Sequence, residues 1–316
     1  MKEKIEKLLD IETLDRNLFR GQGEGGEVAS RVFGGHVIAQ ALAAAYKTVE
    51  ERLCHSLHAY FIRPGDPSTP IIYEVDRARD GGSFTTRRVV AIQNGKQIFN
   101  MAASFHIEEE GWSHQHKMKE VKGPSGVLNR NEQRKLIADK VPEKRRANFL
   151  NPKPIEIRDV DPPDLFNPEP TSDKNFLWFK VDGTLDTKDQ WVHHCFLAYA
   201  SDVSLLGSGN RPHGVSAYSG DVMLASLDHA MWFHEKIDFS EDLPSKIKKW
   251  FHITDLENAA DLLKNKSAAS PLDFTNTADL DAIKTSAISK LSSDITNTAA
   301  FNAVISDALL PVFFTT

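Results

Sequence analysis

The stretch Phe33–Val49 constrains the fold most, because it predicts a helix that is buried on most sides. After a pair of glycines it is built from strong helix formers, including five alanines between positions 39 and 45. Gln40, Tyr46 and Lys47 are its main polar breaks. A helix that is apolar most of the way round lies inside a protein, and alanine lets neighbouring backbone come close. We therefore expect a central helix wrapped by the strand-rich sequence that follows it.

Four strand-like runs follow this helix, and the turns between them indicate an antiparallel meander. Asn94-Gly95 separates the third run from the fourth, and this pair is a strong hairpin signal because a type I′ turn needs positive φ at both central residues. Helices segregated to one face of an antiparallel sheet define an α+β architecture. The four runs are Ser56–Ile62, Ile71–Arg77, Ser83–Gln93 and Lys96–His106.

The segment before the central helix combines an amphipathic pattern with a glycine-rich run. Lys2–Phe19 spaces its leucines and isoleucines as a short helix would. Gly21–Gly26 formally matches the dinucleotide-binding pattern G-x-G-x-x-G, but that pattern has meaning only between a strand and a helix. Because a predicted helix precedes the run and none follows it directly, we interpret the run as a loop.

Residues 111–170 are rich in charge and proline, which predicts a long connector between two folded units. One patch within it, Asn131–Leu150, has helical character. His114 and His116 could ligate a metal, but no further ligand stands at a telling spacing. We therefore interpret this pair as part of a solvated loop and expect no metal site.

A second unit repeats the order of the first. Asn175–Gly183 predicts a strand, Trp191–Leu206 another largely apolar helix, and Asp221–Ile237 a further strand. A weak sequence similarity supports the repeat, because Ser56–Phe61 matches Ser226–Phe233 if two residues are inserted. These two ranges are called the echoed segments. The predicted organisation is a first unit at residues 1–110, the connector at 111–170, a second and incomplete unit at 171–240, and a tail at 241–316.

Asp202 is the residue whose chemistry stands out. It lies near the end of the second apolar helix, where a carboxylate must be solvated at a rim or held by hydrogen bonds. It is either a helix-terminal residue that bonds to neighbouring backbone or a general base that deprotonates a water. Ser226, at the start of the following strand, is the second candidate, and its alternative is a locally bonded strand hydroxyl. Neither Ser226 nor Ser216 stands in a G-x-S-x-G elbow, so a serine-nucleophile hydrolase is unsupported.

Composition limits the classes of partner and compartment. A formal charge of −6 argues against nucleic acid as the main partner, and no apolar run approaches the ~20 residues that span a bilayer. Cys54 and Cys195 are too few for a disulfide framework and are expected to be small core residues. His58 and His229, which lie in the echoed segments, are interpreted as structural. We expect a soluble intracellular protein of the cytoplasm or the peroxisomal matrix, although the chain does not end in Ser-Lys-Leu.

Several motifs carry a resemblance to a known family. Their order across roughly residues 10–240 is far more specific than any one of them. They are Leu18–Gly21, Val32–Leu42, His55–Asp66, Gly82–Val89, Ala91–Phe99, Tyr199–Asp202, Pro212–Gly214 and Ala225–His234. This set resembles the acyl-CoA thioesterase II family.

The resemblance implies a double hot-dog fold, in which each unit wraps a sheet around a long central helix. It implies an enzyme of fatty acid metabolism that hydrolyses fatty acyl-CoA thioesters to free fatty acid and CoA. Acyl-CoA would be the substrate, no metal or prosthetic group would be needed, and the chain would form a homo-oligomer. The family holds the attacking water with an aspartate, a serine or threonine, and a glutamine. By motif, the aspartate corresponds to Asp202 and the hydroxyl to Ser226.

The C-terminal part departs from the family. The family's glutamine comes from strands that complete the second unit, whereas this chain has no glutamine after Gln190. From about Glu241 the resemblance stops, and the apolar spacing of Leu280–Ile295 predicts a helix. Two alternatives to a thioesterase therefore stay open. One is a catalytically weak or inactive acyl-CoA-binding protein on the same scaffold, and the other is a hot-dog hydratase acting on enoyl thioesters.

Overall fold

A computed structural model describes residues 7–25, 30–111, 120–182, 185, 187–218, 222 and 224–239. The chain divides into a unit of residues 1–251 and a second unit of residues 252–316. Every described residue belongs to the first unit. The predicted helix in the tail, and the pair His114 and His116, lie outside the described residues.

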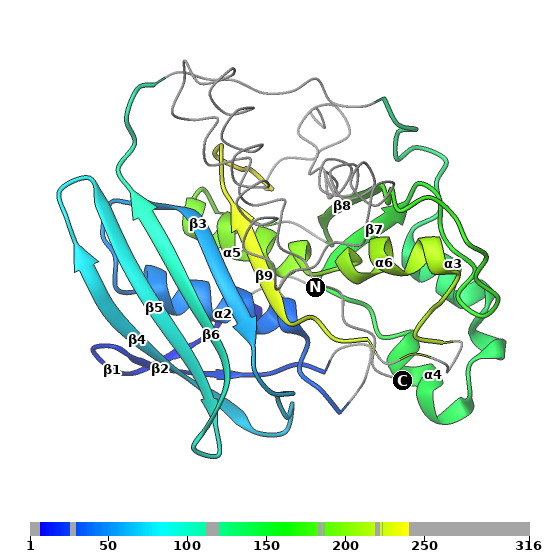
Figure 1. The fold of residues 1–316 in the computed structure, drawn as a ribbon, viewed down its shortest axis with the longest axis horizontal. Coiled ribbons are helices and arrows are strands. Elements are labelled where there is room, and N and C mark those ends of the chain that lie inside the picture. The colour runs from blue at the N-terminus through cyan, green and yellow to red at the C-terminus, as the bar shows by residue number, and fades with distance from the viewer. Residues whose placement is uncertain are drawn as a thin grey trace, which may run out of the picture. The chain divides into compact units, whose positions relative to one another are not determined.

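A seven-stranded antiparallel sheet dominates the first unit (Figure 1). Its spatial order is β1-β2-β4-β5-β6-β3-β9, so the last described strand of the chain lies beside β3. A second sheet has two strands, β7 and β8. The strands are β1 (Glu12–Asp15), β2 (Leu18–Gln22), β3 (Leu53–Phe61), β4 (Pro70–Asp80), β5 (Phe84–Gln93), β6 (Lys96–His106), β7 (Ile155–Asp159), β8 (Leu177–Val181) and β9 (Asp228–Trp232).

The four strand runs predicted after the central helix correspond to β3, β4, β5 and β6. Asn94 and Gly95 join β5 to β6 with φ values of 49° and 72°, both positive as a type I′ turn requires. Within β5, Val89 and Ala91 are buried, whereas Arg88, on the opposite face of the strand, is exposed. The alternation shows that one face of the sheet packs on the core and the other meets solvent.

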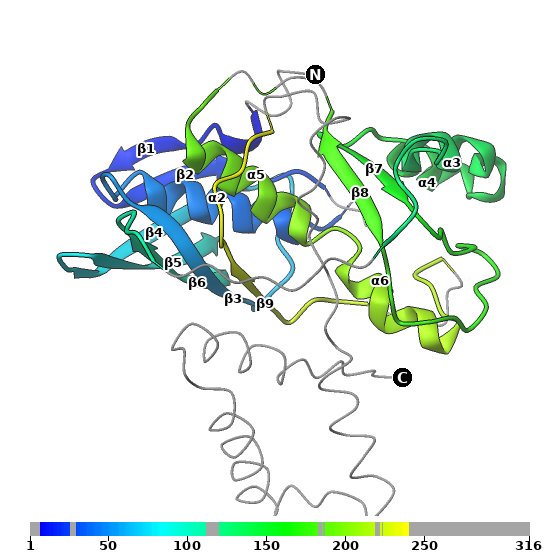
Figure 2. The same ribbon diagram turned by 90° about the horizontal axis from the view of Figure 1, so that it is seen from above.

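Two central helices, α2 (Gly34–Tyr46) and α5 (Gln190–Ser201), lie side by side on one face of this sheet (Figure 2). The predicted burial of α2 is confirmed, since eleven of its residues are buried. The helices meet closely at Gly35, where a Cβ atom would lie 2.4 Å from the carbonyl oxygen of Tyr199. Glycine at this position therefore sets the separation of the two helices.

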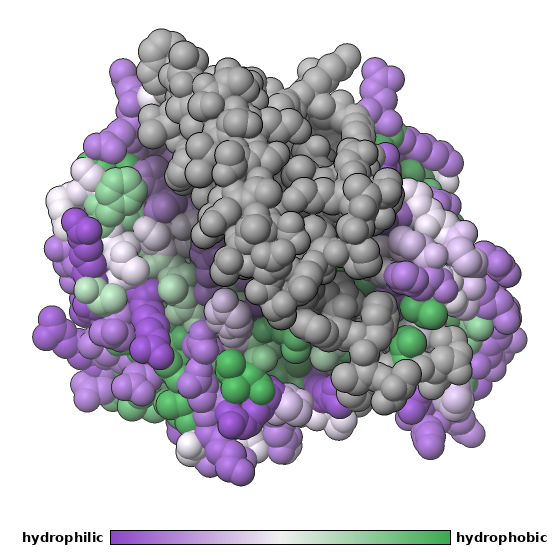
Figure 3. All heavy atoms as spheres, in the orientation of Figure 1, coloured by the Kyte–Doolittle hydropathy of each residue, from purple (hydrophilic) through white to green (hydrophobic). Residues whose placement is uncertain are grey.

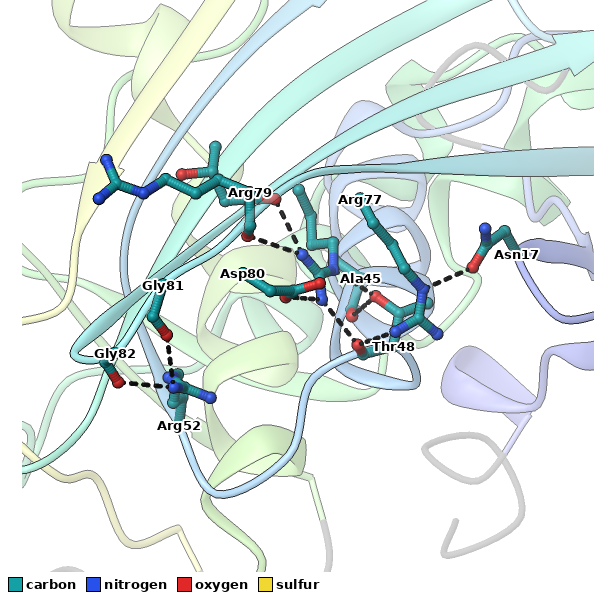
Figure 4. Close-up of polar contacts among 11 residues, drawn as sticks. Asn17, Ala45, Thr48, Arg52, Arg77, Arg79, Asp80, Gly81 and Gly82 are labelled. Atoms are coloured by element: carbon teal, nitrogen blue, oxygen red, sulfur yellow. Dashed lines mark hydrogen bonds and ion pairs between the residues drawn. The ribbon is translucent and has the colours of Figure 1, made fainter.

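Polar contacts from the β4–β5 hairpin surround the C-terminal end of α2 (Figure 4). The Arg87 side chain is only 1% exposed; its Nε donates to Thr48 Oγ1 at 2.8 Å and its Nη2 to the Thr48 carbonyl at 2.9 Å. Asp80 Oδ1 accepts from the same Nη2 at 2.6 Å, and Arg77 Nη1 donates to the Thr48 carbonyl at 3.1 Å. Because carbonyls at a helix end lack intrahelical partners and favour nearby cations, these bonds fix the chain that leaves α2.

The prediction of a helix over Lys2–Phe19 is wrong beyond residue 9, where the described helical residues end. The following residues form β1 and β2, and β2 pairs with β4. Hydrogen bonding along an available sheet edge outweighs the helical spacing of the apolar residues. Gly21 belongs to β2 and not to a loop. A Cβ atom there would lie 2.3 Å from Gln40 Oε1, so glycine lets the strand pass close to α2.

The predicted connector, residues 111–170, contains a strand of the second sheet, since β7 pairs with β8. The single helical patch predicted at Asn131–Leu150 is split. It is broken before Pro142, which has no N–H to continue a helix. The helical pieces are α3 (Arg130–Leu136), a short 3₁₀ helix (Ala138–Lys140) and α4 (Glu143–Phe149).

The second half departs from the predicted repeat in two places. The helix predicted to reach Leu206 ends at Ser201, because Ser204 adopts a left-handed φ of 71° before α6 (Leu205–Asn210) begins. A 3₁₀ helix (Arg211–His213) follows. β9 then pairs antiparallel with β3, so the two echoed segments are neighbours in one sheet and not equivalent strands of two sheets.

The described surface on the face shown in Figure 3 is mostly hydrophilic, with hydrophobic side chains interspersed. Cys54 and Cys195 are free and buried, as predicted, and burial raises the pKa of both thiols. Within the described part of the chain, no helix combines the length and hydropathy needed to cross a membrane. The same residues hold no group of three or more His, Cys, Asp or Glu side chains placed to ligate a metal ion.

Candidate active site

Asp202 lies where the end of α5 meets the beginning of α2. It is the residue directly after α5, and its side chain is only 7% exposed. Its carboxylate accepts a hydrogen bond from the backbone N–H of Gly35. A Cβ atom on Gly34 would lie 2.7 Å from Asp202 Oδ2, so only glycine lets the carboxylate come this close. Asp202 thus bonds to neighbouring backbone, as one of its two predicted roles requires, and it also lies in a buried site.

Burial decides the acidity of this carboxyl group. Desolvation raises the pKa of Asp202 to about 7, and the hydrogen bond from Gly35 opposes the shift. The partial positive charge at the beginning of α2 also favours the carboxylate. A carboxyl group with a pKa near neutrality can accept a proton from water and release it again, which is the property that general-base catalysis uses.

His229 of β9 faces Asp202, with its Nδ1 atom 3.9 Å from Asp202 Oδ1. Its Nε2 atom lies 2.9 Å from Ser201 Oγ, next to Asp202 in the sequence. Burial lowers the pKa of this imidazole to about 4, so it is neutral at neutral pH. Sequence reasoning gave His229 only a structural role shared with His58. The structure separates them, because His58 is exposed beside Trp232 whereas His229 is buried.

Ser226 precedes β9 by two residues and is half-buried. The next residue, Leu227, accepts a hydrogen bond through its carbonyl from the N–H of Phe61 at 2.9 Å. The Phe61 ring in turn packs against Gly34, since a Cβ atom there would lie 2.9 Å from two ring carbons. These contacts place the segment of Ser226 at the edge of the site that Gly34 and Asp202 form.

A pocket opens beside this site, on the side of the connector. Val203 and Tyr199 of the α5 end contribute to it, together with Phe33, whose ring meets the Tyr199 ring edge-on at 5.1 Å. Its remaining lining combines apolar side chains with one amide and three cationic ones. They are Arg130, Asn131, Arg134, Lys153, Ile155 and Ile157.

Arg130 ties this pocket to the turn that follows Asp202. Its guanidinium donates to both carboxylate oxygens of Asp159, at 2.9 and 2.5 Å. The same Nη2 atom donates to Ser204 Oγ at 2.6 Å. Because Ser204 holds the left-handed conformation between α5 and α6, α3 and β7 together support the backbone that carries Asp202.

Comparisons with known proteins identify the family. The family described as acyl-CoA thioesterase N-terminal domain matches residues 23–106, and the family described as acyl-CoA thioesterase matches residues 153–252. The mouse protein named acyl-coenzyme A thioesterase 8 is 39% identical over 238 residues, which cover 73% of this chain and 74% of the relative. The chain belongs to the acyl-CoA thioesterase II family.

Solved structures agree with this assignment to the acyl-CoA thioesterase II family. The acyl-CoA thioesterase II TesB2 of Mycobacterium marinum is 37% identical with a TM-score of 0.58, over 75% of this chain and 81% of that protein. A protein of Alicyclobacillus acidocaldarius described as having a hot dog fold gives a TM-score of 0.56 at 20% identity, over 73% of this chain and 78% of that one. The predicted α+β hot-dog class and the predicted enzyme class, a thioester hydrolase, are confirmed. The homo-oligomer and the compartment stay predictions.

The glutamine that the acyl-CoA thioesterase II resemblance leads us to expect has no counterpart in Gln190. The amide of Gln190 is already engaged at both ends, since Nε2 donates to the carbonyl of Ile237 at 2.9 Å and Oε1 accepts from its N–H at 3.0 Å. The side chain therefore anchors the chain that leaves β9. No glutamine follows it in the sequence.

Proposed function

We propose that this protein hydrolyses fatty acyl-CoA thioesters to free fatty acid and CoA, with Asp202 activating the water and Ser226 helping to hold it. The observation that carries the proposal is the position of Asp202. A largely buried carboxyl group with a pKa of about 7 lies at the beginning of a central helix, in a family of acyl-CoA thioesterases.

The chemistry follows from this position. Asp202 accepts a proton from water while the water oxygen attacks the thioester carbonyl carbon. The partial positive charge at the beginning of α2 stabilises the negative charge that develops on the carbonyl oxygen. When the carbon–sulfur bond breaks, the electron pair goes to the CoA sulfur and the proton on Asp202 follows it. A thiolate is a good leaving group, so no covalent acyl-enzyme is required.

The pocket beside the site supports an acyl-CoA substrate. Such a molecule combines an apolar acyl chain with a carrier that bears phosphates. The pocket offers matching chemistry, since Ile155 and Ile157 supply apolar surface while Arg134 and Lys153 contribute positive charge. Because Tyr199 and Val203 line the pocket next to Asp202, a thioester bound there would have its carbonyl near the carboxylate.

An acyl-CoA-binding protein without turnover is the second candidate. One observation favours it, which is that no glutamine follows Gln190 and that Gln190 itself is engaged elsewhere. Losing one such positioning group typically reduces the rate of hydrolysis by about 10²–10³. Turnover therefore distinguishes the two candidates.

The decisive experiment measures free-thiol release from a long-chain acyl-CoA by the folded full-length protein and by Asp202→Asn. Asparagine keeps the shape of the side chain but cannot accept the proton, so we expect thiol release to fall to background while the far-UV circular dichroism spectrum is unchanged. Asp189→Asn is the matched control, because Asp189 is exposed at the opposite end of α5 and makes no side-chain cap. Full activity in a folded Asp202→Asn variant would disprove the role of Asp202 in activating the water. Binding of acyl-CoA by the wild type without turnover would favour the second candidate.

A further inference from the structure

His229 presents a buried hydrogen-bond acceptor to the candidate active site. The residue is 5% exposed, and its Nδ1 atom has no hydrogen-bond partner among the described residues. That atom lies 3.9 Å from Asp202 Oδ1. Buried polar atoms are nearly always paired, and one that is not requires a physical explanation.

The hydrogen bonds of Ser201 favour the proton on one ring nitrogen of His229. Ser201 uses its hydroxyl hydrogen to donate to the carbonyl of Ala198 at 2.9 Å. Ser201 Oγ can therefore only accept from His229 Nε2, which lies 2.9 Å away. The imidazole then carries its hydrogen on Nε2, and Nδ1, which lies 3.9 Å from Asp202 Oδ1, keeps its lone pair. Burial also keeps the ring neutral, since it lowers the pKa of His229 to about 4.

Two buried acceptors this close together need a donor between them. The distance of 3.9 Å is shorter than two hydrogen bonds of about 2.8 Å placed end to end. One water molecule can therefore donate one hydrogen to Asp202 Oδ1 and the other to His229 Nδ1. Its oxygen lone pairs then remain available for attack on a carbonyl carbon.

We propose that His229 Nδ1 is the second acceptor that holds the attacking water, with Asp202 as the first. This inference rests on the proposed hydrolysis. His229 would supply, from β9, a positioning contact of the kind that the family takes from a glutamine and that Gln190 does not provide here.

The proton balance of the step assigns different roles to the two residues. As the water oxygen bonds to the carbonyl carbon, one proton moves to Asp202, and the other hydrogen stays on the oxygen and keeps its hydrogen bond to His229 Nδ1. The carbon–sulfur bond then breaks, sulfur takes the electron pair, and Asp202 returns its proton to sulfur. The carboxylic acid product loses its remaining proton to solvent. His229 stays neutral throughout and orients the water.

Two substitutions separate the two nitrogen atoms of His229. His229→Asn can place its amide oxygen where Nδ1 lies, which keeps an acceptor for the water but loses the bond to Ser201. His229→Gln can reach the position of Nε2 with its amide N–H, which keeps the bond to Ser201 but loses the acceptor. A purely structural histidine would tolerate glutamine better, whereas a water-holding histidine tolerates asparagine better.

The experiment measures kcat and KM for thiol release from a long-chain acyl-CoA, with thermal unfolding as the check on folding. We expect His229→Gln to lose about 10²–10³ in kcat with an unchanged KM, and His229→Asn to stay within about tenfold of the wild type. An equal loss of kcat in both variants, or a larger loss in His229→Asn, would overturn the role of His229. The proposed function would still hold in that case, because the wild type turns over the substrate. Absence of wild-type turnover would overturn both.

Should either variant fail to fold, Ser201→Ala provides the second measurement. It leaves the imidazole in place but removes the acceptor that holds the hydrogen on Nε2. The ring can then carry its hydrogen on Nδ1, facing Asp202 in place of the water. We expect kcat to fall at least tenfold with KM unchanged, and an unchanged kcat would overturn the inference.

Discussion

Gly34 controls how closely the Asp202 carboxylate approaches the beginning of α2. In Gly34→Ala, the added methyl group would lie 2.7 Å from Asp202 Oδ2 and 2.9 Å from the Phe61 ring. The carboxylate must therefore move, and a displacement of this kind costs about 10²-fold in activity. Alanine is a better helix former than glycine, so the thermal unfolding midpoint should change little. Thiol-release kinetics check the prediction, with Gly111→Ala as control because a methyl group there meets no atom within 4 Å. Wild-type activity in Gly34→Ala would contradict the placement of the site.

The pKa of Asp202 gives activity and stability opposite dependences on pH. The folded protein binds a proton between about pH 4 and pH 7 that the unfolded chain has released, because burial raises the pKa from 3.8 to about 7. The contribution of Asp202 to the free energy of unfolding should fall as pH rises through this window, by up to about 4 kcal/mol. Over the same window kcat/KM should rise, since the base must be ionised. Urea unfolding at pH 5 and pH 8 tests this, with Asp202→Asn as the variant that lacks the effect. An equal pH dependence in both proteins would disprove it.

At the scale of elements, the sequence predicts correctly the helices, strands and turns whose local sequence pattern agrees with their tertiary contacts. The alanine-rich sequence of α2 requires burial, and Asn94-Gly95 requires a hairpin turn, so both were predictable. Lys2–Phe19 has helical spacing, but its residues from Glu12 onward form β1 and the beginning of β2, which pairs with β4. The end of α5 was missed because the conformation of Ser204 is supported by Arg130, which lies far away in the sequence.

In the candidate site, too, the residues with a local sequence signal were predictable and those placed by distant contacts were not. Asp202 could be found because a carboxylate within an apolar helical stretch needs a reason to be there. His229 could not, because the position of its buried acceptor atom results from two hydrogen bonds at the end of α5 and from the pairing of β9 with β3. The pocket could not be foreseen either, since its cationic side chains come from a range that the sequence presented as a connector.

At the scale of the whole described unit, the pairing of β3 with β9 joins the two halves of the chain. The first half is taken as the described residues up to 111, and the second half as those from 120 onward. The first half contributes α2 and six strands of the sheet, and the second half contributes α5 and β9 to the same core. The site depends on this arrangement. Asp202 comes from α5, His229 from β9, and the N–H group that binds Asp202 from α2. Catalytic geometry and cooperative folding of the two halves should therefore be inseparable.

Cooperative folding can be tested with a substitution in one half and a probe in the other. Leu57 of β3 is fully buried, opposite Met231 of β9 and Ala103 of β6. Leu57→Ala should lower the free energy of unfolding by about 2–5 kcal/mol. All five tryptophans lie at residue 112 or later, so no tryptophan that reports unfolding belongs to the first half of the chain. If the halves unfold as one unit, the urea midpoints from fluorescence and from far-UV circular dichroism will shift together.

The same substitution on the surface provides the control for this experiment. Leu136→Ala removes the same atoms at a position that is 72% exposed, and it should change the free energy of unfolding by less than about 0.5 kcal/mol. A fluorescence midpoint that stays at the wild-type value in Leu57→Ala, while the circular dichroism midpoint falls, would show that the second half unfolds independently. In that case the β3–β9 pairing could not be what holds His229 and Asp202 in register, and the site would have to owe its geometry to the contact between α2 and α5.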